Sequence, residues 1–367
     1  MIEYISLKNF KCFDELHIRL TPLTLVTGVN GAGKSTLIQS MLVARQSFIS
    51  RYLQSGKLSL QDSLVNLIDG VSVMYNQAEE EIIEICVEDS HKAYTFKVNE
   101  VDADNHLQSV EVLPDINSIE QLELMADDFV YLNAERLAPQ ESYRLVNSSE
   151  KNYSRLGNAH GDGAIGVLFE AIDKVLELNI KALKADSEDT QRIDENVSAW
   201  LGLIMGAQVK AKVDKVNAKE LKLTYTIGKV ADENNFSPLN AAFGYSYLLP
   251  IVVSVLTAKK NGIILLENPE AHLHPGAQFR LGEFLALAAQ QGIQIVVETH
   301  SDHLLNGVRV ATKKRKITPD NITIQYFSER EGIHMSQRIV ISEDGDLDKW
   351  PGGFFDEWEK ALNELIG

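Results

Sequence analysis

The chain has 367 residues, 44% of them hydrophobic, and a net charge of -17. This length buries a large core and accommodates two domains, or one domain with a sizeable insertion. The negative charge argues against a strongly basic surface that wraps nucleic acid, because such binding requires clustered lysines and arginines. The basic run 313–316 is a candidate for a local groove, and we interpret it instead as a solvated helix end.

The two cysteines, Cys12 and Cys86, are far apart and lack metal-type spacing. They indicate a reducing compartment and no disulfide framework. Residues 1–4 show no signal-peptide features, and no apolar run is long enough to span a bilayer. We therefore expect a cytoplasmic protein with no membrane partner.

The first elements lead into a glycine loop. Alternating apolar residues over 2–10 and 17–20 predict short strands, and the apolar run 23–26 predicts a third. A loop with the spacing G-x-x-x-x-G-K-S follows and opens onto a helix expected over 35–48. This is the context of a phosphate-binding loop: backbone N–H groups surround the phosphates, the lysine reaches them and the serine hydroxyl meets Mg²⁺. The predicted loop comprises Gly28, Val29, Asn30, Gly31, Ala32, Gly33, Lys34, Ser35 and Thr36.

The middle of the chain changes from strand-like to helix-like patterns. Segments 82–87, 94–98 and 129–132 predict an antiparallel sheet that covers one side of the nucleotide fold. Apolar residues at helical spacing over 164–205 predict two or three helices in a separate lobe. Two strands, 210–213 and 221–227, and a helix over 248–258 come next.

The last third alternates strands and helices. Strands 262–267 and 293–298 alternate with helices 277–289 and 302–312, which predicts a parallel sheet covered on both faces. Two edge strands and an amphipathic terminal helix complete the chain; they are expected over 322–327, 334–341 and 354–366.

A phosphate loop needs a carboxylate for the metal ion. Glu267 ends an apolar strand, so we expect it at the carboxyl edge of the sheet, next to Ser35. His300 follows the second buried strand and should lie at the same edge.

Three motifs together carry a family resemblance. The phosphate loop 28–36, the run E-N-P-E-A-H-L-H-P at 267–275 and E-T-H-S at 298–301 resemble the ABC/SMC-type ATPases, in particular their OLD-like prokaryotic branch. Segments 7–11 and 131–136 are similar to further marks of that family, and the tail 350–356 resembles that of stand-alone ATPases found beside defence genes.

The resemblance implies an α/β fold: an ABC/SMC-type P-loop NTPase core with an antiparallel β lobe and a helical insertion lobe. The expected divisions are 1–139 for the phosphate loop and β lobe, 140–208 for the insertion and 209–367 for the second half of the core. The stretch 140–208 is too short for a long coiled-coil arm. We also expect no room after the core for the metal-binding domain of OLD nucleases, and we interpret the acidic run 344–348 as a solvated loop.

The resemblance also implies roles for single residues. Glu267 stands where such ATPases hold Mg²⁺, and Asn268 stands where the catalytic glutamate is expected. An amide orients water but takes no proton, so slow turnover is expected. Glu270 is the nearest replacement base; the alternatives are a helix cap or a contact with a partner subunit. His300 matches the switch histidine that senses the γ-phosphate, and a structural histidine is the alternative.

Two further residues come from less specific matches. Ser246 lies in the segment 242–247, which resembles the signature segment and is expected to open a helix; it would contact the γ-phosphate across a dimer interface, or serve only as an N-cap. Arg136 would steady the γ-phosphate, or else pair with Glu135 or Glu141 at the surface. No glutamine is assigned to the loop that usually links the nucleotide to the β lobe.

Four histidines also have spacing compatible with zinc, although no cysteine partner lies nearby. They are His272, His274, His300 and His303. We favour the interpretation that 272–275 shapes a loop facing a second subunit.

The expected function is therefore that of an ATPase with ATP and Mg²⁺ as cofactors, closing as a head-to-tail homodimer and acting as a two-state switch. The resemblance suggests anti-phage defence, with a separate effector such as a nuclease or a toxin. The alternatives are a regulatory scaffold that sequesters a toxin with little hydrolysis, and a DNA-sensing ATPase of the repair type, for which nucleic acid would be a partner.

Overall fold

The computed structural model describes residues 1–145, 153–185, 190–228, 235–355 and 357–366. A core sheet carries the predicted motifs, and its strands follow the order β16-β15-β3-β14-β13-β8. The strands from β15 to β8 run parallel to one another, and β16 is antiparallel to β15. In that order, their bounds are Ile333–Ile339, Ile322–Arg330, Leu23–Gly28, Gln294–Glu298, Ile263–Glu267 and Phe129–Leu132.

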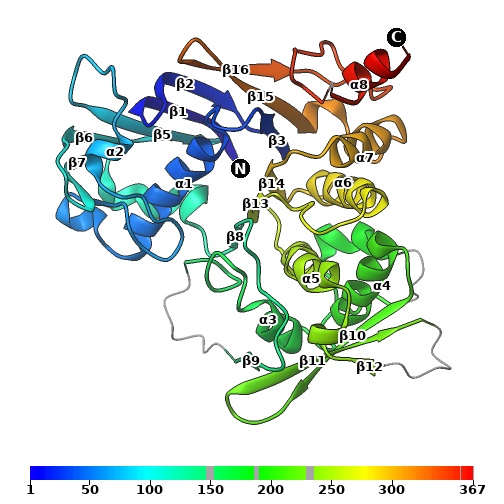
Figure 1. Cartoon of the computed structure of the whole chain (residues 1–367). Helices are drawn as coiled ribbons and strands as arrows, with labels where there is room; N and C mark the ends of the chain where they lie inside the picture. The colour runs from blue at the N-terminus through cyan, green and yellow to red at the C-terminus, as the bar shows by residue number, and fades with distance from the viewer. Residues whose placement is uncertain (146–152, 186–189, 229–234, 356, 367) are drawn as a thin grey trace.

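Successive side chains of the core strands point to opposite faces of the sheet and pack into two different hydrophobic cores. Leu265 and Val296 belong to the core that includes helix α1 (Lys34–Ile49). Their neighbours Ile264 and Val297 belong to the core that includes the other covering helices. Those helices are α5 (Phe243–Leu256), α6 (Pro275–Gln290) and α7 (Asp302–Lys313), and Figure 1 shows them on one side of the sheet. The parallel sheet is thus covered on both faces, as predicted.

The predicted antiparallel sheet forms the lobe beside α1, at the left of Figure 1. Its strand order is β2-β1-β5-β6-β7-β4, and each neighbouring pair is antiparallel. In that order, the bounds are Phe13–Arg19, Ile2–Phe10, Ile83–Asp89, Ala93–Glu100, His106–Leu113 and Leu58–Ser59. Short helical turns lie beside the sheet: η1 (Leu53–Ser55), α2 (Gly70–Val73), η2 (Ile116–Gln121) and η3 (Glu123–Met125).

One strand assigned to this lobe from the sequence belongs elsewhere. Phe129–Leu132 is β8 of the core sheet, where all four residues are buried and pair in parallel with β13. The assignment was wrong because a strand buried on both faces shows no alternation to identify its sheet.

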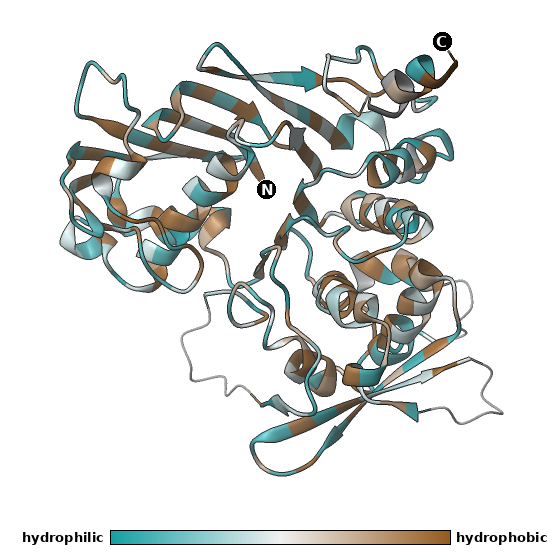
Figure 2. Ribbon diagram, viewed as in Figure 1, coloured by the Kyte–Doolittle hydropathy of each residue, from teal (hydrophilic) through white to brown (hydrophobic). Residues whose placement is uncertain are grey.

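The segment predicted as a helical insertion forms short helices: α3 (Ala164–Glu170), η4 (Leu178–Leu183) and α4 (Ile193–Met205). A small sheet lies beside them, with β9 (Tyr143–Arg144), β10 (Val209–Lys215), β11 (Glu220–Ile227) and β12 (Asn235–Phe236). Leu168 and Leu201 share a hydrophobic core with Leu249 of α5, so these helices pack directly against the helices of the core. Figure 2 shows hydrophobic residues, in brown, concentrated in the core strands and in α5.

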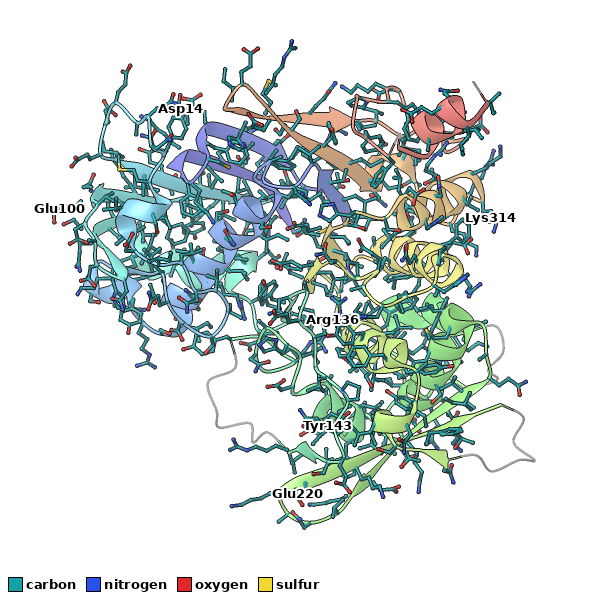
Figure 3. The ribbon with its side chains drawn as sticks, viewed as in Figure 1. Asp14, Glu100, Arg136, Tyr143, Glu220 and Lys314 are labelled. Carbon is teal, nitrogen blue, oxygen red and sulfur yellow. The ribbon has the colours of Figure 1, made fainter. Side chains whose placement is uncertain are left out.

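The C-terminal part differs from expectation in one respect. Strand β15 lies between β3 and β16, so β16 alone of the two predicted edge strands is at the edge. Helix α7 ends in the basic run, and Figure 3 shows Lys314 on the outer side of the molecule. Helices η6 (Pro238–Asn240), η7 (Pro319–Asn321) and α8 (Glu357–Ile366) complete the elements. Across the described ranges, none of the helices combines the length and apolar character that a membrane span requires.

Candidate functional site

The glycine loop turns sharply between β3 and α1, against neighbouring strands. At Gly28 (φ 141°) a Cβ atom would lie 1.9 Å from the carbonyl oxygen of Phe327 in β15. At Gly33 (φ 97°) a Cβ atom would lie 2.6 Å from the ring of Phe13 in β2. Both positions therefore require glycine, for its positive φ and for its lack of a side chain. Phe327 and Phe13 therefore pack directly against the backbone of the loop.

Lys34 curls back over this loop. Its Nζ donates hydrogen bonds to the carbonyl oxygens of Gly28 (3.1 Å) and Val29 (2.8 Å). Burial lowers the pKa of Lys34, and the charge of Glu298 acts in the opposite direction. The ammonium group is therefore placed at the loop, facing a carboxylate at the sheet edge.

The carboxylate that meets Ser35 is Glu298, which corrects the expectation for Glu267. Ser35 Oγ donates a hydrogen bond to Glu298 Oε1 at 3.1 Å. The strand order explains this, because β14 lies directly beside β3 whereas β13 lies one strand further away. Glu267 and Glu298 are paired neighbours in the register of β13 and β14. Glu298 is the first residue of the E-T-H-S motif, in which the sequence resemblance assigned a role to His300 alone.

The two carboxylates perturb each other. Burial and then the charge of Glu267 raise the pKa of Glu298 to about 7, against the lowering effects of Ser35 and Lys34. Burial also raises the pKa of Glu267. Glu298 Oε2 is buried without a hydrogen-bond partner. A hydroxyl and two carboxylates are hard oxygen donors of the kind that Mg²⁺ prefers, so the donor set fits such a cation.

Tyr131 is a site residue for which sequence analysis proposed no role. Its hydroxyl donates a hydrogen bond to Glu267 Oε1 at 2.9 Å, and burial raises the pKa of this phenol. Tyr131 opens the segment 131–136 that resembles a mark of the family, but a tyrosine in a buried strand gives no sequence signal for its partner. Tyr131 orients Glu267 from β8, on the side away from β3.

Arg136 is buried between the end of β8 and the turn that follows β13, near the centre of Figure 3. It is 3% exposed and donates hydrogen bonds to the carbonyl oxygens of Asn133 (3.1 Å), Glu267 (2.8 Å) and Asn268 (2.7 Å). The alternative of a surface ion pair with Glu135 or Glu141 is therefore wrong. Burial lowers the pKa of Arg136 to about 10, opposed most strongly by Glu270.

The turn after β13 places Asn268 and Glu270. Asn268 has φ 43°, its N–H donates to the Glu298 carbonyl oxygen at 2.8 Å, and its Oδ1 is buried without a partner. Glu270 Oε1 accepts a hydrogen bond from the backbone N–H of His300 at 2.7 Å, whereas Oε2 is buried without a partner. His274 caps α6, so the alternative that Glu270 caps this helix is wrong. Unpartnered acceptors thus gather at one edge of the sheet.

The histidines with zinc-compatible spacing lie in different environments. His300 is exposed at the sheet edge, and partial desolvation of its ring and the charge of Lys34 lower its pKa. His272 packs edge-on against the rings of Phe243 and Tyr247. Over the ranges that the structure describes, no group of three or more His, Cys, Asp or Glu side chains is arranged to hold a metal ion.

Ser246 does not open a helix, which corrects that expectation. Helix α5 begins at Phe243 with Ala242 as its N-cap residue, so Ser246 occupies the fourth helical position. Ser246 is 5% exposed, with its hydroxyl buried, whereas Phe243 is 43% exposed. The surface at this helix end is therefore aromatic. Tyr247, one turn further along α5, lies closer to the interior. The guanidinium carbon of Arg136 is 5.5 Å from the centroid of its ring.

A cleft of about 890 Å³ opens beside the phosphate loop. Its walls come from the loop, the β lobe and the β15–β16 hairpin, and Lys11 at its side donates to Gln39 Oε1 at 2.6 Å. The lining includes Lys11, Cys12, Lys34, Ser35, Gln39 and His334. A ligand in this cleft can reach the lysine and the serine of the loop together.

The chain is similar to proteins of known families. The family model described as "AAA domain, putative AbiEii toxin, Type IV TA system" matches residues 23–306, and one described as "Protein of unknown function (DUF3696)" matches 317–365. An OLD nuclease from Thermus scotoductus is 23% identical over 90% of this chain and 65% of its own length. The chromosome partition protein Smc of Methanocaldococcus jannaschii is 28% identical over 27% of this chain and 8% of its own length. The chain thus spans less than two thirds of these relatives.

Solved structures show the same fold at low identity. An Smc head bound to the C-winged helix domain of ScpA covers 93% of this chain and 98% of its own, with 12% identity and a TM-score of 0.53. The Smc head with an extended coiled coil, bound to the C-terminal domain of ScpA from Pyrococcus furiosus, covers 100% of this chain and 99% of its own, with 13% identity and a TM-score of 0.54. The predicted core, with its curled antiparallel β lobe, is confirmed. The chain belongs to the family described as "AAA domain, putative AbiEii toxin, Type IV TA system" and is an OLD-like ATPase of the ABC/SMC type.

Proposed function

We propose that this ATPase binds ATP with Mg²⁺ and hydrolyses it slowly, as a homodimeric switch for a separate effector in anti-phage defence. The observation that carries the nucleotide part is that Lys34 and Ser35 line the 890 Å³ cleft together, with the Ser35 hydroxyl hydrogen-bonded to the carboxylate of Glu298. A cationic group, a hydroxyl and buried carboxylates at the N-terminus of α1 suit a phosphate chain and its metal ion.

The chain's own residues divide the work. Lys34 and the loop N–H groups bind phosphate, and the Ser35 hydroxyl together with carboxylate at the strand ends supplies oxygen donors for the cation. When bound, the cation would neutralise the charge that develops on the transferred phosphoryl group. Arg136 holds the carbonyl oxygens of Glu267 and Asn268, so it fixes the strand end from which the carboxylate extends.

Slow turnover follows from the residue at the base position. The Asn268 amide can orient water but accepts no proton from it. Glu270 is the replacement base in this proposal: its Oε2 is buried without a partner, and burial raises its pKa. A carboxylate with a raised pKa is a better proton acceptor than an exposed one.

The switch itself would lie between two copies. His300 is exposed at the edge of the site, where a γ-phosphate can be sensed. The end of α5 presents Phe243 at the surface, and its cluster with Tyr247 and His272 leads to Arg136. We propose that this aromatic end, with Ser246 behind it, meets the nucleotide-bearing face of the second subunit. The defence setting and the effector rest on the resemblance of the motifs to the OLD-like family.

Nucleotide binding tests the proposal first. Lys34→Ala should abolish binding of ATP measured by calorimetry while the circular dichroism spectrum stays unchanged; unchanged affinity would refute it. Lys314→Ala, at the far end of α7, is the matched control and should bind as the parent does.

Light scattering with ATP tests the dimer. The parent should double in mass with ATP and Mg²⁺, and Phe243→Asp should stay monomeric while still binding nucleotide. If the parent remains monomeric with saturating ATP, the switch proposal fails.

A further inference from the structure

Glu298 has the attributes of a ligand whose partner arrives from outside. It ends β14, is 6% exposed, and accepts the Ser35 hydroxyl hydrogen through Oε1 at 3.1 Å. Its second oxygen, Oε2, is buried and has no hydrogen-bond partner. An unpartnered buried carboxylate oxygen is costly, so this atom points to a positive group that the site takes up.

Glu267, the carboxylate named by the sequence motif, is held differently. Its Oε1 already accepts the hydroxyl hydrogen of Tyr131 from β8, on the side away from the phosphate loop. Neighbouring strands lie about 4.8 Å apart. Glu298 therefore ends one strand spacing from β3, whereas Glu267 ends two spacings away.

The charges nearby are consistent with a cation between these groups. Lys34 faces Glu298 and partly compensates its charge, while Glu267 and Glu270 repel it. A divalent cation beside Ser35 would relieve that repulsion and complete the oxygen donor set.

We infer that Glu298 is a direct carboxylate ligand of the divalent cation, beside the hydroxyl of Ser35, and that Glu267 supports the cation from the next strand. This inference rests on the proposed function, since the cation arrives with the nucleotide. It departs from the motif-based assignment, which gives that role to Glu267 alone.

Manganese binding tests the inference without relying on turnover. Electron paramagnetic resonance measures free and bound Mn²⁺ in the presence of a non-hydrolysable ATP analogue. Glu298→Gln keeps the shape and an oxygen for Ser35 but removes the charge. It should weaken Mn²⁺ binding more than fivefold, and more than Glu267→Gln does. Glu135→Gln, an exposed charge on the neighbouring loop, is the control and should leave binding unchanged.

Every other result overturns the inference. If Glu298→Gln binds Mn²⁺ within fivefold of the parent while hydrolysis falls, Glu298 acts on the attacking water and is no metal ligand. Binding of the analogue is also measured in EDTA, and thermal melting confirms that each protein is folded. These measurements distinguish a failure of the proposed function from a failure of the inference about Glu298. If the parent protein does not bind the ATP analogue, the proposed function and the inference are both refuted. If the parent binds the analogue, and Mn²⁺ increases the analogue affinity of the parent and of Glu298→Gln equally, the inference alone is refuted.

Discussion

Replacing Arg136 tests how much the buried guanidinium contributes to the site. The side chain donates three hydrogen bonds to carbonyl oxygens, and each bond to a charged group is worth about 1.5–3 kcal/mol. Against this stands the cost of burying the charge. The pKa of Arg136 falls from 12.5 to about 10, which corresponds to roughly 3 kcal/mol at about 1.4 kcal/mol per unit. Arg136→Met should therefore lower the free energy of unfolding by about 3 kcal/mol.

The comparison with lysine makes this prediction sharper. Arg136→Lys keeps the buried charge, but a single ammonium cannot reproduce the fork that reaches the carbonyl groups of Glu267 and Asn268 together. Arg136→Lys should thus destabilise the protein at least as much as Arg136→Met does. An exposed control, Arg338→Met on β16, should change stability by no more than about 0.5 kcal/mol.

Urea denaturation followed by circular dichroism measures these differences. ATP turnover is measured below the transition, where each variant is folded; kcat should fall more than tenfold for both Arg136 variants, since the strand end that carries Glu267 loses its anchor. A lysine variant more stable than the methionine variant, or full turnover in either, would refute the argument.

Three further predictions concern the reaction. Asn268→Glu restores a proton acceptor at the base position and should raise kcat by about tenfold or more in a phosphate-release assay; an unchanged rate would mean that proton transfer does not limit turnover. Glu270→Gln should lower kcat with nucleotide affinity unchanged, and if it hydrolyses ATP as fast as the parent, Glu270 is not the base. EDTA should remove most of the stabilisation by ATP, which amounts to about 2.7 kcal/mol at a ligand concentration of 100 Kd; equal melting temperatures with and without EDTA would contradict the proposed cation.

The sequence by itself determined the phosphate loop and the strand ends. The spacing of Gly28, Gly33 and Lys34 by itself indicates a phosphate-binding loop. Continuous apolar runs before Glu267 and Glu298 predict buried parallel strands. These signals are local in the chain, so no knowledge of the packing was needed. The strong helical patterns of α6 and α7 were predicted for the same reason.

Only the tertiary structure decided which of these ends meet. The insertion of β14 between β3 and β13 puts Glu298 against Ser35, and strand order is not encoded in any short segment. Arg136 was recognised as a site residue, but its partners are backbone carbonyl groups, which leave no trace in the sequence. Ser246 was misplaced because helix α5 begins at Phe243, three residues before it, which buries its hydroxyl. Motifs identify the chemistry of this ATPase, and packing between distant strands decides which side chain performs each part.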